Sequence, residues 1–301
     1  MKANYSKSSK ISLALLAFTL CLFLSCSSGK KDTDQKYFEN NIDFYQLKGK
    51  IKSLTETGFK TVEKFGEIQK GSPGSKMIYL FNENGSLDKE LTYGVDGKEA
   101  AKTVCIYDKK GNIIEVNYFR DDSLEDKLTY KYDGAGNKIE RNVYNPNGTL
   151  IRKFINKFDE KGKNIEENYY NANGDLESKQ IFKYDKYGNN IILESYQADG
   201  SLKNRTTFIY DSKKNLTDKS IFNKNLELSE RESYRYDDSG KMIEKIYYWK
   251  NMADKAIYDY QNYDKNKNWL IKIQKYFPLN TMNSTSVLPV VTMIEREIQY
   301  Y

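Results

Sequence analysis

Residues 184–191 read Tyr-Asp-Lys-Tyr-Gly-Asn-Asn-Ile, and this stretch decides the fold because its pattern returns along most of the chain. An aromatic residue followed by Asp or Asn recurs every 25 to 27 residues. The eight copies begin at Phe81, Tyr107, Tyr132, Phe158, Tyr184, Tyr210, Tyr236 and Tyr263. Such a constant register over many copies indicates an internal structural repeat.

Each repeat contains two turns. In the first, Gly follows the aromatic residue by four positions, as in Tyr184 and Gly188. A second, weaker turn motif begins 12 residues after the first aromatic residue and has the same aromatic-to-glycine spacing, as in Tyr196 and Gly200. Two turns in 26 residues leave two strands of about eight residues each, the length and spacing of an antiparallel meander. We therefore predict an all-β fold, an antiparallel β-meander built from 26-residue double-hairpin repeats.

The turn residues have a conformational reason. Asp185 is placed to accept backbone N–H groups at the start of its turn, and Gly188 supplies the positive φ that closes a type I turn with a bulge. Lys214 and Lys267 replace this glycine in two copies, and the Asn that follows each is expected to tolerate the same conformation. Calcium binding is the alternative role for the Asp residues. No copy has the dense carboxylate spacing of a calcium loop, so turn capping is favoured and no metal site is predicted.

Strand alternation separates two faces. Leu176, Phe182 and Tyr184 are an even number of residues apart, so their side chains share one face of a strand, while Lys and Glu occupy the other. About sixteen strands plus end strands exceed the roughly ten of a usual open sheet. We expect a rolled or superhelically coiled sheet with the Leu and Tyr face inward. A transmembrane barrel is disfavoured because nearly every strand carries Lys or Glu, which leaves no charge-free band for lipid.

Both ends of the array depart from the repeat. Residues 45–76 are strand-like but out of register, and we assign them as N-terminal capping strands ahead of the array at 77–276. A last strand of the array is expected over 269–276. Residues 277–301 are expected to form a polar loop and a C-terminal capping strand. Terminal repeats are atypical because each is expected to cover an open edge.

The N-terminus has the pattern of a secretory signal over residues 1–25, with three lysines ahead of an apolar run at 11–24. That run is shorter than the roughly 20 residues of a membrane-spanning helix. Phe23-Leu24-Ser25-Cys26 resembles a lipobox, which predicts that Cys26 receives acyl chains such as palmitate and anchors the protein to a membrane. An ordinary cut near Ser25 is the alternative. Residues 26–44 are expected to be a flexible tether after lipidation.

Composition excludes several classes of function. The chain has no histidine, which removes Ser-His-Asp and Cys-His catalysis and histidine-bound zinc. Loss of the signal removes three lysines, so the net charge falls from +6 to +3, and the charges are interspersed along the strands. No basic stripe for nucleic acid is present. Cys105 remains as a single cysteine and is interpreted as a buried apolar residue, with no cofactor predicted.

The Tyr-Asp-x-x-Gly-Asn pattern followed by Ile or Leu, at 107–113, 132–139 and 184–191, resembles the YD repeat of bacterial Rhs-type surface and toxin-shell proteins. The half-repeat from Tyr170 to Leu176 resembles MORN-like repeats. The resemblance covers about residues 77–273, and the unit is longer than a usual YD repeat. The lipobox followed by Lys30-Lys31-Asp32 is similar to lipoproteins of the Bacteroidetes group, which implies an outer-membrane lipoprotein that is periplasmic or exposed at the surface.

The favoured function is a non-catalytic binding or scaffold module of the cell envelope. The resemblance to YD-type proteins implies carbohydrate binding, and tyrosine rings can stack on the faces of sugars. Glycan is therefore the first ligand class to consider. The cluster Tyr247-Tyr248-Trp249, at a turn without glycine, is the candidate ligand site. The alternative role for each Tyr is to fill a half-buried strand position, which its β propensity favours.

The alternatives are a protein-interaction factor and an enzyme. A protein-interaction or assembly factor, antitoxin-like or part of a surface complex, would use the sheet face or an edge strand. An enzyme would need paired carboxylates, for which Glu166-Glu167 and Asp121-Asp122 are the candidates. Neighbouring strand residues point to opposite faces, so these pairs are not expected to converge, and no catalytic residue is predicted.

Overall fold

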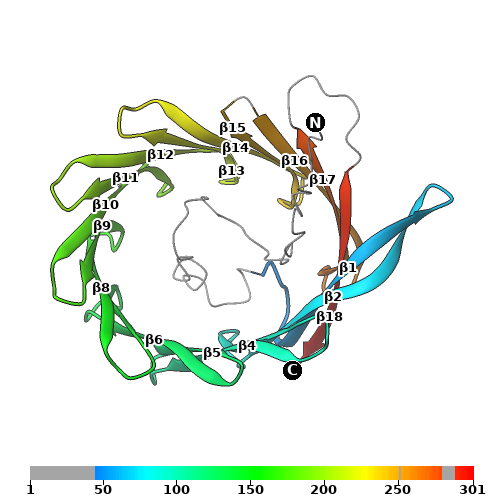
Figure 1. Ribbon diagram of the computed structural model, residues 1–301, viewed down its shortest axis with the longest axis horizontal. Helices are drawn as coiled ribbons and strands as arrows, with labels where there is room; N and C mark the ends of the chain where they lie inside the picture. Colours follow the sequence, from blue (N-terminus) through cyan, green and yellow to red (C-terminus); the bar gives the residue numbers. More distant parts are fainter. Residues whose placement is uncertain (1–44, 251, 280–288) are drawn as a thin grey trace, which may run out of the picture.

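The computed structural model describes residues 45–250, 252–279 and 289–301 (Figure 1). The predicted signal, the tether and Cys26 lie outside the described residues. Within them the chain forms strands and turns, and no helix long and apolar enough to cross a membrane occurs. The strands are β1 (Ile51–Lys64), β2 (Glu67–Phe81), β3 (Leu87–Tyr93), β4 (Glu99–Tyr107), β5 (Ile113–Arg120), β6 (Ser123–Tyr132), β7 (Lys138–Tyr144), β8 (Leu150–Phe158), β9 (Asn164–Asn171), β10 (Leu176–Tyr184), β11 (Asn190–Gln197), β12 (Leu202–Tyr210), β13 (Leu216–Asn223), β14 (Leu228–Tyr236), β15 (Met242–Trp249), β16 (Met252–Tyr263), β17 (Trp269–Leu279) and β18 (Val290–Tyr300).

The eighteen described strands form one closed sheet. Each strand pairs antiparallel with the next along the chain, and β1 also pairs with β18, so the sheet closes into a barrel that appears as a ring in Figure 1. The predicted all-β antiparallel meander with two strands per repeat is confirmed. The two ends of the array pair with each other rather than each covering an edge of its own, because β1 and β18 run side by side from Ile51 and Tyr300 to Lys60 and Thr292.

The turns between repeats have the predicted geometry. Asp185 Oδ1 accepts hydrogen bonds from the backbone N–H groups of Tyr187 and Asn189, at 2.8 and 2.9 Å. Gly188 has φ of 90° and donates its own N–H to the carbonyl of Asp185 at 3.1 Å. Asp108, Asp133, Asp159, Asp211, Asp237 and Asp264 cap their turns in the same way. These contacts show the Asp side chains capping their turns, as predicted.

One detail of the turns differs from expectation. Lys214 and Lys267, which replace the glycine, themselves take positive φ of 66° and 64°. The Asn after each does not take over this conformation. Instead, Asn215 donates its side-chain amide to Asp211 Oδ2 at 2.9 Å. The turn therefore keeps its shape at the position where glycine is missing, and lysine bears the strain there.

Two segments show which face of the sheet points inward. The segment Tyr45–Lys50 lies inside the ring in Figure 1, and Tyr45 packs with Leu54 and Tyr79 in one buried cluster. These side chains therefore face the interior. The β1–β2 hairpin projects outside the ring, and its residue Phe59 packs with Ile273 in a second cluster. Ile273, and with it Lys275 and Phe277 of β17, therefore face outward.

The inner face is not purely apolar, in contrast to the prediction. Val116, Leu128 and Phe154 form its apolar part. Arg141 and Glu167 are buried beside them, with 3.7 Å between their nearest charged atoms. The guanidinium of Arg141 also lies 3.7 Å from the ring centroid of Phe154. Buried charge is tolerated when it is paired, and each of these groups has an opposite charge or an aromatic face against it.

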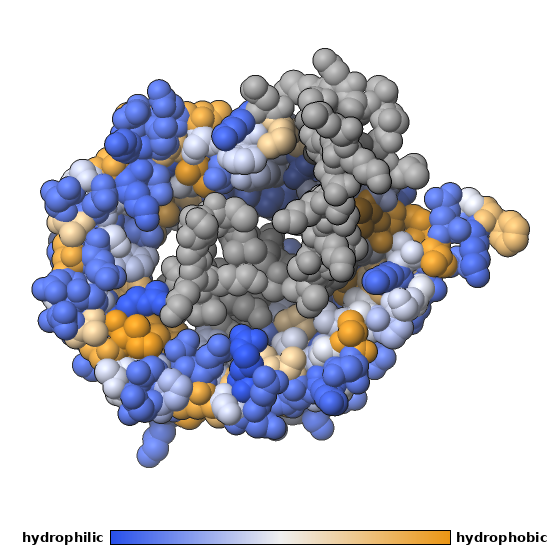
Figure 2. Space-filling model, viewed as in Figure 1, coloured by the Kyte–Doolittle hydropathy of each residue, from blue (hydrophilic) through white to orange (hydrophobic). Residues whose placement is uncertain are grey.

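The outer face carries rows of ion pairs between neighbouring strands. Glu140 on β7 contacts Lys131 on β6 at 2.7 Å and Lys153 on β8 at 3.1 Å. Partial burial alone would raise the pKa of Glu140, but hydrogen bonds from Lys131, Asn142 and Lys153 outweigh it and lower the pKa to about 2. Similar contacts join Glu194 to Lys183 and Arg205. Hydrophilic residues accordingly dominate the rim of the ring in Figure 2.

The motif tyrosines have a repeated structural role. The hydroxyl of Tyr184 donates to the backbone carbonyl of Asn164, at the start of a neighbouring hairpin strand, at 2.6 Å. Four other motif tyrosines make the equivalent bond: Tyr107 to Leu87, Tyr132 to Ile113, Tyr210 to Asn190 and Tyr236 to Leu216. In these five copies the motif Tyr therefore ties its repeat to the one before it. In the last copy Tyr260, three residues before the motif Tyr263, donates to Met242 instead.

Cys105 is buried in β4, as predicted, and is the one free cysteine among the described residues. Burial raises the pKa of its thiol to about 12. The thiol is therefore protonated at neutral pH and packs as a small apolar side chain.

Candidate functional site

The β1–β2 hairpin supplies one wall of the candidate site. We call its outer part, residues 59–73, the arm. Two register shifts in the pairing of β1 with β2, on either side of Phe59, bend the hairpin away from the ring. The bend brings the backbones together at Gly71, where an added Cβ would lie 2.8 Å from the carbonyl oxygen of Lys60. Glycine is thus required at this position for the arm to keep its course.

Contacts with the outer face hold the arm in place. Phe59 and Ile68 of the arm pack against Ile273 of β17 and Met293 of β18. Thr61 donates its hydroxyl to the carbonyl of Val291 at 2.9 Å. Lys70 forms an ion pair with Glu295, and its ammonium group lies 3.9 Å from the ring centroid of Phe59. These contacts fix the arm against β17 and β18.

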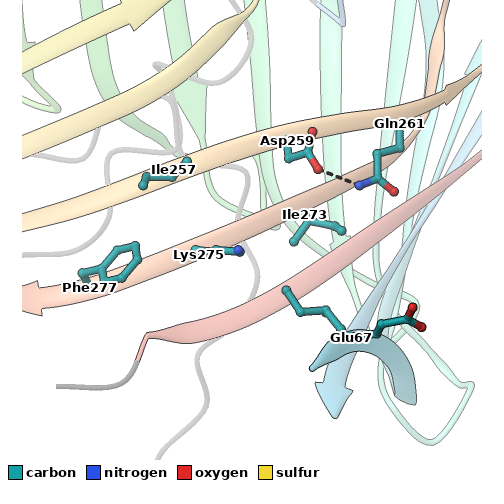
Figure 3. Close-up of a pocket in the computed structure, with 8 residues that line it drawn as sticks. Glu67, Ile257, Asp259, Gln261, Ile273, Lys275 and Phe277 are labelled. Atoms are coloured by element: carbon teal, nitrogen blue, oxygen red, sulfur yellow. Dashed lines mark hydrogen bonds between the residues drawn. The ribbon is translucent and has the colours of Figure 1, made fainter. Parts of the chain in front are cut away.

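A groove of about 610 Å³ lies between the arm and the outer face of β16 and β17 (Figure 3). This volume falls within the range of small-molecule sites in proteins, about 300–1,000 Å³. Eight residues line it: Glu67 and Ile68 of the arm, Ile257, Asp259 and Gln261 of β16, and Ile273, Lys275 and Phe277 of β17. The lining alternates because every second residue of each strand points outward.

The groove combines an apolar floor with convergent polar groups. Ile257, Ile273 and Phe277 provide apolar surface. Asp259 and Gln261 are neighbours on β16, and Gln261 Nε2 donates to Asp259 Oδ2 at 2.6 Å (Figure 3). Their remaining carboxylate and amide atoms can accept and donate further hydrogen bonds. Such a lining suits a ligand with an apolar face and a polar edge.

A second cluster lies on the inner face, where β17, β18 and β1 meet. Arg296 Nε donates to Glu56 Oε1 at 2.8 Å, and its guanidinium lies 3.5 Å from the ring centroid of Trp269. Lys272 is buried beside this pair. Burial lowers the pKa of Lys272 to about 8, with the carboxylate of Glu56 opposing the shift and the charge of Arg296 contributing to it. Because Arg296 also donates to the carbonyl of Tyr45, this cluster joins the first described segment to the closure of the sheet.

The structure does not bring the predicted ligand residues together. Tyr247 and Trp249 alternate with Tyr248 on β15, so Tyr247 and Trp249 share the inner face and Tyr248 lies on the outer face. The guanidinium carbon of Arg231 lies 5.6 Å from the ring centroid of Tyr248. Trp249 ends the strand, 42% exposed, with the Lys250 ammonium 4.7 Å from its ring centroid. None of the three lines the groove.

The candidate carboxylate pairs do not converge either. Glu166 lies on the outer face of β9 with Lys157 at 2.7 Å, whereas Glu167 lies on the inner face and accepts the hydroxyl of Tyr169 at 2.6 Å. Asp121 and Asp122 form the two-residue turn between β5 and β6, both with positive φ. Within the described ranges, no group of three or more metal-ligating Cys, Asp or Glu side chains occurs.

Sequence reasoning missed the groove residues. The polar loop was expected to begin at residue 277, but β17 continues to Leu279, and Phe277 lies on its outer face. The alternation of Ile271, Ile273, Lys275 and Phe277 carries this signal past the predicted strand end. The arm carries no comparable signal, because its bend depends on where the long hairpin meets β17 and β18.

Comparison with solved structures finds similar chains at low sequence identity and low TM-score. No family model matches the chain, and no curated protein matches it. A porin-like protein from Bacteroides uniformis is similar, with 10% identity, coverage of 83% of this chain and 98% of that one, and a TM-score of 0.46. A TcdB2–TccC3 complex with Cdc42 shows 13% identity, coverage of 77% of this chain and 15% of that one, and a TM-score of 0.31. The Photorhabdus luminescens Tc holotoxin pore shows 12% identity, coverage of 76% of this chain and 16% of that one, and a TM-score of 0.28.

Proposed function

We propose that the chain is a non-catalytic binding module of the cell envelope and that it holds a glycan in the groove beneath the arm. The observation that carries this proposal is the lining of the groove. The Phe277 ring and the Ile257 side chain suit the apolar face of a sugar ring, while Asp259, Gln261 and Lys275 suit its hydroxyl edge. The groove is open along two strands, so a short oligosaccharide fits better than a single compact molecule.

The proposal moves the ligand site from the Tyr247-Tyr248-Trp249 cluster to the groove. Three side chains split between the two faces of β15 cannot contact one sugar together. The motif tyrosines are also poor candidates, because hydroxyls such as that of Tyr184 are used to bind the neighbouring repeat. The groove gathers its polar atoms on one face, where they are available to a ligand.

The binding experiment uses residues 27–301 with neutral and acidic oligosaccharides on an array, followed by calorimetry on the best sugars. Phe277→Leu removes the aromatic face and is expected to weaken binding about tenfold, which corresponds to a loss of about 1.4 kcal/mol in binding free energy. Asp259→Asn keeps the shape and changes the hydrogen-bonding pattern, and a similar loss is expected. Phe222→Leu, an outer-face aromatic on β13, is the matched control and is expected to bind like the wild type. Equal affinities for Phe277→Leu and wild type would remove the groove as the glycan site.

The envelope location rests on the lipobox at Cys26. Mass spectrometry of the protein from its own membranes is expected to find acyl chains on Cys26, and Cys26→Ala is expected to release the chain from the membrane fraction. Protease treatment of intact cells then separates a surface position from a periplasmic one. Recovery of an unacylated N-terminus at residue 26 would favour the ordinary signal cut instead.

A protein-interaction role is the second candidate, and the tip of the arm is the observation that favours it. Phe65 at this tip is fully exposed, which is unusual for a phenylalanine in a well-packed chain. Co-purification with crosslinking distinguishes the roles, because a stoichiometric protein partner without any sugar binding would replace the glycan proposal.

A further inference from the structure

The tip of the arm combines exposure with backbone strain. Phe65 and Gly66 close the hairpin as a two-residue turn, with φ of 55° and 80°. Asn is the usual first residue of such a turn, and a bulky side chain at positive φ is strained. The Phe65 side chain has a relative exposure of 103%, and Figure 2 shows a hydrophobic tip standing out from the ring among hydrophilic residues. Neither local conformation nor packing within this chain accounts for Phe65.

An apolar receptor for such a ring lies next to the tip. Glu67 and Ile68, directly after the turn, line the groove. The ring of Phe65 does not fill this groove in its own chain, because it is fully exposed. The floor of the groove is formed by Ile257, Ile273 and Phe277, side chains that suit an inserted phenylalanine.

We propose that Phe65 of one copy inserts into the groove of a second copy, giving a two-fold dimer through exchanged arm tips. The tip and the groove are adjacent on the same outer surface. A two-fold axis beside the arm therefore brings each tip to the groove of the other copy in the same movement. Both contacts form together, and the assembly closes at two copies.

The tip and the groove each carry both signs of charge, so opposite charges can be paired across the contact. Glu63, Lys64 and Glu67 are exposed around the Phe65 ring. The groove offers the carboxylates of Asp259 and of its own Glu67 as partners for Lys64, and Lys275 as a partner for Glu63 of the incoming tip. Glu63 and Glu67 also oppose insertion of the tip into a lipid surface, because both carboxylates would have to approach the hydrocarbon with the ring. A second copy is therefore favoured over a membrane as the occupant.

The inference shares the groove with the proposed glycan function but does not rest on its ligand. A tip and a sugar cannot occupy one groove together, so glycan binding is expected to separate the dimer. The ligand-free protein would keep its apolar groove covered, which limits exposure of hydrophobic surface.

Sedimentation equilibrium of residues 27–301 over a concentration series tests the dimer. The wild type is expected to dimerise reversibly, and Phe65→Ser is expected to weaken dimerisation at least tenfold, because each copy loses a buried ring. Val95→Ser, at an exposed position of another turn, is the matched control and is expected to dimerise like the wild type. Circular dichroism and the melting temperature show that the variants are folded.

A mixing experiment separates the proposed contact from a general loss of association. Phe65→Ser keeps an intact groove, and Phe277→Ala keeps an intact tip, so each variant alone lacks both contacts of the dimer. An equimolar mixture restores one tip-to-groove contact and is expected to form heterodimers more strongly than either variant alone. No heterodimer above the level of the separate variants would overturn the inference.

The outcomes distinguish the two proposals. A monomeric wild type up to about 100 μM overturns the dimer, and so does a Phe65→Ser variant that dimerises like the wild type. Loss of vesicle retention by the lipidated protein on Phe65→Ser, with no change in association, would assign the tip to lipid instead. Sugar binding that persists in Phe65→Ser supports the glycan proposal independently, whereas a dimer without any sugar binding supports only the present inference.

Discussion

The guanidinium of Arg296 on β18 and the carboxylate of Glu56 on β1 meet at the line where the sheet closes, with Nε and Oε1 2.8 Å apart. Their side chains are 3% and 5% exposed. Closure of the barrel thus places one buried ion pair between the first and last strands.

Removing one partner of this pair is expected to destabilise the fold strongly. Glu56→Gln leaves the buried Arg296 charge uncompensated, and the free energy of unfolding in urea is expected to fall by about 3 kcal/mol. The control is Glu125→Gln, which breaks the exposed pair with Arg120 and is expected to change stability by less than about 0.5 kcal/mol. Equal losses for the two variants would show that burial at the closure does not strengthen the pair.

Stability is expected to rise with pH between about 8 and 10 because of Lys272. Burial lowers its pKa to about 8 in the folded chain, so the unfolded chain binds more protons above that pH. Between pH 7.5 and 9.5 this one group is expected to add about 2 kcal/mol to the free energy of unfolding. The measurement is urea unfolding at both pH values for wild type, Lys272→Met and the exposed control Lys109→Met. A pH dependence that survives in Lys272→Met would assign it to another group, with Lys138 the next to test because burial lowers its pKa to about 8 as well.

The tyrosine hydroxyls that join the repeats are expected to contribute individually. Tyr132→Phe removes the 2.8 Å bond to the carbonyl of Ile113 and is expected to cost about 1 kcal/mol, because that carbonyl loses its partner in a half-buried position. Tyr187→Phe, in an exposed turn, is the control and is expected to be neutral. The values come from urea unfolding at one pH. Neutral behaviour of Tyr132→Phe would mean that water replaces the hydroxyl without loss.

The turn positions with positive φ are expected to respond in opposite directions. Lys214→Gly relieves a side chain held at φ of 66° and is expected to stabilise the fold by about 0.5 kcal/mol after the entropy of glycine is counted. Gly200→Ala imposes the same strain at φ of 83°, where an added Cβ meets nothing within 4 Å, and is expected to cost about 1 kcal/mol. Thermal unfolding of both variants provides the check, and a shift of the same sign in both would contradict the conformational explanation.

The repeat was predictable because its signals are local. Asp185 and Gly188 define a turn within five residues, and the even spacing of Leu176, Phe182 and Tyr184 defines a strand face. Local signals fix the order and direction of the strands. They do not fix whether the sheet closes, because that depends on the summed twist and curvature of all of its strands.

The candidate site was not predictable from the same signals. Tyr247 and Trp249 form a conspicuous aromatic cluster in the sequence, yet alternation along β15 separates them from Tyr248. The groove depends on contact between the arm and β17. Two of its lining residues, Ile68 and Phe277, are 209 positions apart in the chain. No spacing rule within a repeat indicates such a contact.

The closed sheet also constrains how the chain reaches its native state. In the described sheet, every pairing except that of β1 with β18 joins consecutive strands, whereas Arg296 and Glu56 are 240 residues apart. Hairpins of consecutive strands form on a microsecond scale, and a loop of this length closes at a far greater entropic cost. The ring is therefore expected to assemble hairpin by hairpin as an open ribbon and to close last. During that interval the unpaired edges of β1 and β18 are the part of the molecule most exposed to association with other chains.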